Sequence, residues 1–339
     1  MKRNYLAFII FFFTTLTYAQ IGGRYTYQFL NLVSSPRQAA LGGKYVTGYN
    51  ADPTSAMLNP ASINSEMNNQ LAVNYVNYIS DVNYGSVAYA KALGKKERMF
   101  HVGITYINYG TFDGFDEFEN PTGDFSAGEV AISLGYAYNI PSSKFYVGAN
   151  AKFVSSKLEE YTSIGGALDL GLIYHNPETK FDFGLSVRNL GGQFTAYDEV
   201  KEDIPLSIDA GIAQTLKNVP IRWNLTLENL QVWDVAFRNP TRDVTDLEGN
   251  VEADDPGFIN NALRHVVLGV EFFPESGFNL RLGYNFRRSE ELRIEGQRSF
   301  AGLSGGFSLK LGKFRFAYSY ARYNSAAASS TFGINLNLQ

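Results

Sequence analysis

The alternation of apolar and polar residues is the feature that most restricts how this chain can fold. From Leu71 onward, apolar side chains recur at every second position, not in the 3.6-residue rhythm of a helix. Within 277–287, for example, Phe278, Leu280 and Leu282 alternate with polar residues or glycine. Successive side chains of a strand point to opposite faces, so each such segment predicts a strand with one apolar and one polar face. The sequence therefore predicts an all-β fold.

Fourteen segments of this kind follow one another along 70–339. Most of them approach the roughly 9–11 residues that cross a bilayer as a tilted strand, whereas strands of soluble proteins are usually about 5–6 residues long. An even strand number is expected for a bacterial transmembrane barrel. We therefore predict an antiparallel outer-membrane β-barrel of about 14 strands. The predicted strands are 71–79, 82–91, 99–109, 129–139, 144–155, 162–175, 181–189, 205–214, 220–229, 264–273, 277–287, 301–311, 313–322 and 331–338.

The connections between the predicted strands alternate in length. Those that follow even-numbered strands are tight, whereas several that follow odd-numbered strands are long and polar. Transmembrane barrels have short periplasmic turns and long outer loops, so this asymmetry favours a membrane barrel over a soluble sandwich. The long connections are predicted at 110–128, 190–204, 230–263 and 288–300.

The N-terminus has the layout of a secretory signal peptide. Lys2 and Arg3 precede an apolar run over 5–16, and Ala19 provides a small residue at a cleavage site. The alternative is a membrane anchor, but the apolar run is short for a membrane span. We predict a signal peptide at 1–19, and its removal leaves 27 basic and 33 acidic residues, a net charge of −6.

Residues 20–69 lack the alternation and form a separate unit before the first strand. The stretch 35–41 predicts a short helix that ends at Gly42 and Gly43, and Asp52-Pro53 predicts the start of a second turn. We expect this segment to fold into the barrel as a plug. The alternative is a periplasmic tail.

The polar face of the strands carries a balanced set of charges. A Lys or Arg on the lipid face at mid-membrane costs roughly 2–4 kcal/mol, so the polar face must line the lumen. Six basic and six acidic residues lie on this face, which favours ion pairs within the lumen and opposes a strongly ion-selective pore. The polar lining also opposes a channel with a hydrophobic lumen. The residues are Lys152, Arg188, Arg222, Arg281, Lys310, Arg315, Glu129, Asp169, Asp182, Asp209, Glu228 and Glu271.

Glycines recur on the same face of most strands. Glycine within a strand marks either curvature or close approach of another backbone, and we interpret this set as room for the plug, with strand bending as the alternative. The positions are Gly103, Gly135, Gly148, Gly171, Gly184, Gly211, Gly269, Gly283, Gly306 and Gly333.

Catalytic patterns are weak in this chain. The stretch 302–306 formally matches G-x-S-x-G, but a nucleophile elbow needs a strand-to-helix turn and this one lies inside a predicted strand. His101, His175 and His265 lie on separate strands without a ligand-spaced partner. The formal charge of −4 and the lack of a basic cluster oppose nucleic-acid binding. We predict no enzymatic activity, no cofactor and no metal.

Short motifs in the N-terminal segment resemble known families. Asn59-Pro60-Ala61 resembles the Asn-Pro-Ala stretch in the hatch of the FadL superfamily, whose barrels also have fourteen strands. The segments 22–23, 27–32, 35–43 and 59–61 resemble the start of the PorV/PorQ family. So does 83–90. This family belongs to the type IX secretion system of Bacteroidota.

The resemblance implies a role that the residue pattern does not show. It implies a non-enzymatic component of the type IX secretion system, embedded in outer-membrane lipid of a Gram-negative cell of the Bacteroidota. Such a component scaffolds the surface attachment complex that anchors secreted cargo. PorZ is the expected direct partner, with PorU and PorV in the same complex. Chemistry in that complex belongs to PorU.

Two functional hypotheses remain open from the sequence. The first is the secretion scaffold, and the alternative is a FadL-like channel for hydrophobic small molecules. Aromatic residues of the outer loops are candidates for partner contact, because exposed aromatics anchor interfaces, although ordinary loop packing explains each one equally well. They are Phe112, Phe115, Phe118, Tyr197, Trp233 and Phe237.

Overall fold

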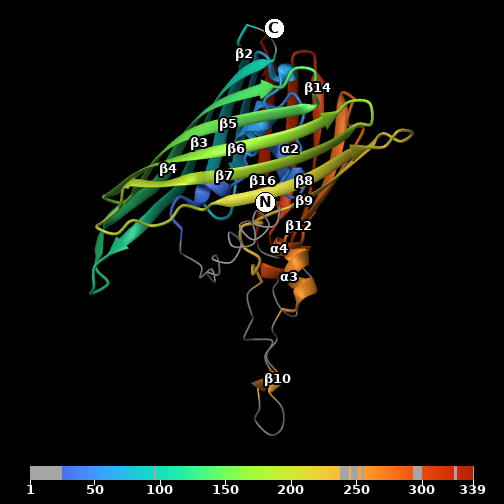
Figure 1. Cartoon of the computed structure of the whole chain (residues 1–339). Coiled ribbons are helices and arrows are strands. Elements are labelled where there is room, and N and C mark those ends of the chain that lie inside the picture. Colours follow the sequence, from blue (N-terminus) through green and yellow to red (C-terminus); the bar gives the residue numbers. More distant parts are fainter. Residues whose placement is uncertain are drawn as a thin grey trace, which may run out of the picture.

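Fourteen antiparallel strands close into one barrel (Figure 1). Closure is made between the first and last strands, where Tyr75 pairs with Phe332 and Gln70 pairs with Asn337. The computed structural model describes residues 25–94, 97–236, 244–245, 251–252, 256–292, 300–323 and 327–338. The predicted signal peptide 1–19 and Phe237 lie outside these residues. The predicted fold class, an all-β barrel of about 14 strands, is confirmed.

Each predicted strand segment overlaps one barrel strand. Outside the barrel, β10 (Val244–Thr245) and β11 (Val251–Glu252) pair with each other in a separate two-stranded sheet. The barrel strands are β1 (Gln70–Asn77), β2 (Asn83–Ala92), β3 (Arg98–Phe115), β4 (Pro121–Asn139), β5 (Phe145–Leu158), β6 (Tyr161–Asn176), β7 (Phe181–Thr195), β8 (Ser207–Thr215), β9 (Ile221–Leu227), β12 (Val266–Phe272), β13 (Phe278–Asn285), β14 (Leu303–Leu311), β15 (Phe314–Arg322) and β16 (Ala328–Asn337).

The predicted loop at 110–128 is wrong, because most of it is strand. β3 continues to Phe115 and β4 begins at Pro121, so the two form a long hairpin. Gly110 has a φ of +90° and the register shifts beside it, which interrupts the alternation on which the prediction depended. Beyond that point both faces of the hairpin are largely exposed, so a polar sequence is compatible with strand.

Three other predicted boundaries also need correction. β7 runs to Thr195, so the connection predicted at 190–204 is shorter than expected. The strand predicted from 264 starts only at Val266, because α3 (Phe258–Arg264) occupies the preceding residues. The strand predicted to end at 287 stops at Asn285, whose side chain accepts a hydrogen bond from Arg288 N and thereby begins α4 (Phe286–Glu291).

The two faces of the barrel wall have opposite chemistry. Large apolar side chains such as Val73, Leu134 and Leu282 are exposed on the outside, whereas polar ones such as Asp169 are fully buried inside. Soluble proteins have the opposite arrangement, with apolar residues inside and polar ones outside. The arrangement seen here is stable only where the outer surface meets lipid. Within the described part of the chain, no helix is long and apolar enough to cross a membrane.

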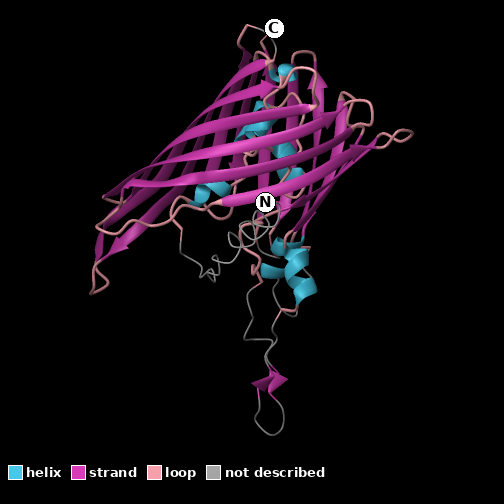
Figure 2. Ribbon diagram, in the orientation of Figure 1, coloured by secondary structure: helices cyan, strands magenta, loops and turns pink. Residues whose placement is uncertain are grey.

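Short helices fill the inside of the barrel (Figure 2). They confirm the two turns that the sequence predicts after Ser35 and after Asp52. They pack on the inner wall, with α2 against β14 and β15 and η3 against β5 and β6. We call the described residues 25–69 the plug. Its helices are η1 (Gln28–Asn31), α2 (Pro36–Ala40), η2 (Pro53–Met57), η3 (Pro60–Ser62) and η4 (Ser65–Met67).

The two ends of the barrel differ in the length of their connections. The C-terminal residues lie beside the tight turn between β14 and β15, because Asn337 N donates to Lys313 O. α3, α4 and β10 lie at the opposite end (Figure 1). Short turns are periplasmic in transmembrane barrels, so the first end is the periplasmic end and the second is the outer end.

Candidate functional site

The plug threads the barrel from its outer end to its periplasmic end. At the outer end Tyr25 forms a parallel bridge with Asp203 in the β7–β8 connection, and Thr26 N donates to Asp203 O over 2.9 Å. The segment then passes through the lumen and joins β1 at Gln70.

Glycines of the wall allow the plug to lie directly against the strands. A Cβ on Gly184 would lie 2.4 Å from Val46 O, and a Cβ on Gly283 would lie 2.2 Å from Gly42 N. An added Cβ would lie near a plug atom at nine of the ten positions, but at Gly135, Gly211, Gly306 and Gly333 a wall atom is as near or nearer, and at Gly269 it would meet only Asn224. The nine are Gly103, Gly135, Gly148, Gly171, Gly184, Gly211, Gly283, Gly306 and Gly333.

The Asn59-Pro60-Ala61 motif forms a buried turn at the centre of the plug. Asn59 Oδ1 accepts from Ala61 N over 3.0 Å and begins η3. Asn59 Nδ2 donates to Val46 O in the plug and to Leu185 O in β7, over 2.8 and 3.4 Å. The side chain thus satisfies backbone groups on both sides, which explains the need for an amide at this position.

Buried ion pairs connect the wall to itself and to the plug. Lys152 pairs with Asp169 over 2.7 Å, and Arg188 pairs with Asp209 over 3.1 Å. Lys44 of the plug lies 3.7 Å from the same Asp209 carboxylate. Burial lowers the pKa of Lys44 and the neighbouring Arg188 adds to this effect, whereas Asp209 opposes it.

A second set of ion pairs lies toward the periplasmic end. Arg37 of the plug contacts Glu271 over 2.9 Å, and Arg281 approaches the same carboxylate over 3.5 Å. Arg222 pairs with Asp182, which also contacts His175 Nδ1 over 2.5 Å. The sequence did not identify Arg37 and Lys44 as partners, because the path of the plug through the lumen has no local signal.

Four of the predicted lumen charges form no ion pair among the described residues. Glu129 accepts a hydrogen bond from Tyr109 Oη over 2.5 Å, and Glu228 accepts one from Asn285 Nδ2 over 3.2 Å. Arg315 donates to the side chain of Asn279, and Lys310 lines a cavity. The inner face therefore carries equal numbers of basic and acidic residues, as predicted, but only eight of these twelve charges form ion pairs with one another.

An apolar cavity of about 610 Å³ opens at the outer end, which we call the outer cavity. Phe112, predicted as a partner contact, stacks on Phe125 with ring centroids 5.3 Å apart. Tyr197, predicted likewise, bonds Ser156 Oγ over 2.5 Å through its hydroxyl. The described lining contains three carboxylates and no Lys or Arg. It consists of Tyr25, Thr26, Tyr27, Gln28, Tyr109, Phe112, Phe125, Ala127, Glu129, Leu158, Glu159, Tyr161, Tyr197 and Glu202.

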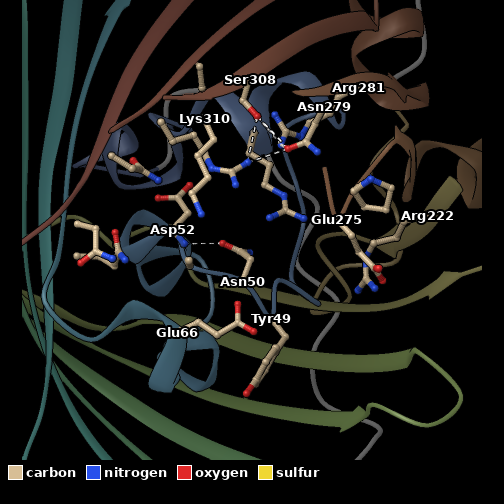
Figure 3. A pocket seen from close by; sticks show the side chains of 18 of the residues that line it. Tyr49, Asn50, Asp52, Glu66, Arg222, Glu275, Asn279, Arg281, Ser308 and Lys310 are labelled. Carbon is tan, nitrogen blue, oxygen red and sulfur yellow. Dashed lines mark hydrogen bonds between the residues drawn. The ribbon is translucent and has the colours of Figure 1, made fainter. Parts of the chain in front are cut away.

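A polar cavity of about 580 Å³ opens at the periplasmic end, which we call the periplasmic cavity. Figure 3 shows Asp52, Lys310 and Arg281 around its interior. Its lining contains three carboxylates, Asp52, Glu66 and Glu275. It contains seven basic residues, which are Arg37, Lys180, Arg222, Arg281, Lys310, Lys313 and Arg315.

The plug leaves little space beside the mid-barrel ion pairs. A void of about 30 Å³ lies there, lined by Phe29, Met57, Lys152 and Arg188 among others. That volume is a small fraction of either larger cavity. In this arrangement the plug separates the two larger cavities.

The other predicted contact residues that the structure describes lie on the outer surface. Phe115 and Phe118, at the tip of the β3–β4 hairpin, are 61% and 81% exposed. Trp233 is 54% exposed and packs on Phe258, with ring centroids 5.0 Å apart. These aromatics are thus accessible from the outside, whereas Phe112 and Tyr197 line the outer cavity.

Two of the residues considered for catalysis, Ser304 and His265, form hydrogen bonds with backbone groups. Ser304 Oγ accepts from Gly42 N and donates to Ala40 O, both in the plug, over 3.1 Å. His265 contacts the carbonyl oxygens of Glu228 and Trp233. Among the described residues no group of three or more His, Cys, Asp or Glu side chains could hold a metal ion.

Comparisons with known proteins identify the class of fold. No protein-family model and no curated protein matches the sequence. Among solved structures, the toluene transporter TbuX of Ralstonia pickettii is 14% identical, covers 92% of this chain and 100% of its own, and has a TM-score of 0.55. A deltaS2 mutant of the monoaromatic hydrocarbon channel TodX is 13% identical, over 91% of this chain and 98% of its own, with a TM-score of 0.53.

A FadL homologue of Pseudomonas aeruginosa is also similar, with 9% identity over 90% of this chain and 98% of its own and a TM-score of 0.50. At such identities the likeness concerns the fold. The protein is an outer-membrane β-barrel. More particularly, its fold, in which fourteen strands close around an N-terminal plug, is similar to that of these FadL-like barrels.

Proposed function

We propose that the protein binds small, neutral hydrophobic molecules in its outer cavity and admits them past the plug. The observation that carries this proposal is the apolar lining of the outer cavity. Aromatic rings from β3, β4, β6 and the start of the plug surround a volume within the roughly 300–1,000 Å³ range of ligand sites. Such a lining binds apolar ligands by removing their surface from water.

The charge of the outer cavity supports a neutral ligand over an anionic one. Glu129, Glu159 and Glu202 line it without a basic residue beside them in the described lining. A fatty-acid carboxylate would be repelled there, since like charges disfavour each other. TbuX and TodX, described as a toluene transporter and a monoaromatic hydrocarbon channel, fit the same class of ligand.

Passage requires the plug to rearrange. The void of about 30 Å³ beside the mid-barrel ion pairs is far smaller than the outer cavity, so a ligand held in the outer cavity cannot pass this point unless the plug moves. The plug is fixed by buried ion pairs of Lys44 and Arg37, and local rearrangement of a plug needs less energy than opening the wall, where backbone bonds are continuous.

Uptake of radiolabelled toluene tests this function. Cells that lack the gene would carry either the wild type or Phe112→Asp, and we expect the variant to reduce initial uptake several-fold. Phe115→Asp is the matched control, because Phe115 lies in the same strand but outside the cavity lining. Equal uptake with and without the gene would contradict the proposal.

A second candidate is the surface scaffold of the type IX secretion system. The resemblance of segments within 22–61 and of 83–90 to the PorV/PorQ family supports it. The packed, charged lumen supports it too, because a scaffold needs no passage. Exposed aromatics at Phe118 and Trp233 provide surface for PorZ or another partner. The comparisons favour the hydrophobic channel over this candidate, since TbuX and TodX are described as a transporter and a channel.

Deletion of the gene in its own host separates the two candidates. Cargo with type IX sorting signals would be quantified on the surface, in the medium and in the periplasm, and toluene uptake would be measured in the same cells. Loss of surface cargo with normal uptake supports the scaffold. Normal cargo with reduced uptake supports the channel.

A further inference from the structure

We propose that the periplasmic cavity is a binding site for a small organic anion that carries two carboxylate or phosphate groups. The cavity lies on the other side of the plug from the outer cavity, and its residues take no part in binding the hydrophobic ligand proposed above. The inference therefore does not depend on which of the two functions is correct.

The first observation is an excess of positive charge. Seven basic residues and three carboxylates line the cavity, which leaves a difference of +4. Two further carboxylates on the inner face of the wall, Glu271 and Asp182, are not part of the lining but pair with lining arginines. Counting them, seven positive charges still face five negative ones. Crowding of like charge is unfavourable unless a counter-charge is present.

The second observation is the way in which three arginines are held together. Arg37 and Arg281 share the single carboxylate of Glu271. Arg281 and Arg315 share Oδ1 of Asn279, over 3.1 and 2.8 Å. Two acceptors thus position three guanidinium groups, and a planar guanidinium can bind carboxylate or phosphate through two parallel hydrogen bonds.

The third observation is that donors of this cluster remain unused. Nε of Arg37 and Nε of Arg281 are buried and have no hydrogen-bond partner in the structure. A buried donor without a partner costs about 1–3 kcal/mol, so such atoms need an explanation. These two atoms have almost no accessible surface, so an anion would reach them only after the guanidinium groups turn toward the cavity, but its binding to the cluster would neutralise the excess charge.

The size and shape of the cavity favour a molecule over a single ion. About 580 Å³ is within the usual range for small-molecule sites. Basic residues come from separate parts of the wall, since Arg222 lies on β9 whereas Lys310 and Arg315 lie on β14 and β15, with β12 and β13 between them. A ligand with two anionic groups can contact both parts. Figure 3 shows Arg222 and Lys310 apart from each other across the cavity.

Binding would be measured by isothermal titration of the full-length mature protein in nanodiscs with citrate and with inorganic pyrophosphate. These two probes distinguish carboxylate from phosphate chemistry. We expect saturable binding of at least one of them, and about tenfold weaker binding to Arg315→Met, which loses a charged hydrogen bond. Lys310→Gln is the second variant, with a smaller loss, in case Arg315→Met folds poorly.

Lys144→Met is the matched control. Lys144 lies at the same end of the barrel and pairs with exposed Glu178, but it is not part of the cavity lining. Its substitution should leave affinity unchanged. The gel mobility of each variant, compared before and after boiling, shows whether the barrel is folded.

Three results would overturn the proposal. The first is no saturable binding of either probe at millimolar concentration. The second is an equal loss of affinity in Lys144→Met and Arg315→Met. The third is much tighter binding of a ten-residue polyglutamate peptide than of citrate, which would assign the cavity to an acidic segment of a periplasmic protein.

Discussion

The outer and periplasmic cavities are nearly equal in volume but opposite in chemistry. The outer cavity has an aromatic lining with three carboxylates, whereas the periplasmic cavity has a polar lining with seven basic residues. The plug that separates them is tied to the wall by buried ion pairs. The difference teaches that a lumen with balanced total charge can still present a negative, apolar site on one side and a positive, polar site on the other.

The largest expected effect concerns the ion pairs that fix the plug between the two cavities. Asp209→Ala leaves Lys44 and Arg188 without their buried carboxylate, and we expect a loss of about 3–5 kcal/mol in unfolding free energy. Urea unfolding of the folded barrel in lipid would measure it. Glu178→Gln, which removes an exposed partner, should cost less than about 1 kcal/mol. Similar losses in both variants would show that the plug is not held in this way.

A second test removes the separation itself. Gly184→Val places a Cβ 2.4 Å from Val46 O, so the plug must shift, at a cost of about 1–3 kcal/mol. We expect single-channel conductance in planar bilayers to rise as the cavities become connected. Gly192→Ala is the control, because a Cβ at Gly192 meets nothing within 4 Å. A variant that remains as closed as the wild type would argue that the plug can adapt without opening.

A third test changes the charge of the outer cavity. The triple substitution of Glu129, Glu159 and Glu202 to Gln removes all three of its carboxylates. We expect uptake of dodecanoate to rise about threefold, because each charge contributes only a few tenths of a kcal/mol in a wet site. Toluene uptake should stay within experimental error. A parallel rise for both ligands would mean that shape, not charge, limits entry.

The smallest expected effect is a difference in salt dependence. Raising NaCl from about 50 to 300 mM should weaken pyrophosphate binding at the periplasmic cavity by a few-fold, because exposed charges are screened. Toluene uptake through the outer cavity should change little, since burial of apolar surface depends weakly on such salt concentrations. An equal effect of salt on pyrophosphate binding and on toluene uptake would contradict the proposed difference in charge between the two cavities.

Much of the barrel could be predicted because alternation is a local property. A strand that faces lipid on one side must place apolar residues at every second position, and the fourteen segments therefore appear in the sequence itself. The prediction was wrong where that constraint ends. At 111–115 and 121–128 the β3–β4 hairpin extends with both faces largely exposed, so strand and loop have the same composition.

The candidate sites were predicted only in part. Lys310, Arg315, Arg222 and Arg281 were expected on the inner face, and the structure places all four in the lining of the periplasmic cavity. Of the proposed partner contacts, Phe112 and Tyr197 instead line the outer cavity. Phe237 lies outside the described residues. The secretion role and the partner PorZ remain proposals.

The sequence by itself determined the number of strands, their approximate positions, the face that meets lipid and the glycines that receive the plug. Each of these is set by residues that are neighbours along the chain or alternate within one strand. Only the tertiary structure decided which charges meet and where the two cavities lie. Arg37 and Glu271 pair across 234 positions, because strand register and the path of the plug bring them together. Those long-range choices depend on packing of the whole barrel, which no local pattern records.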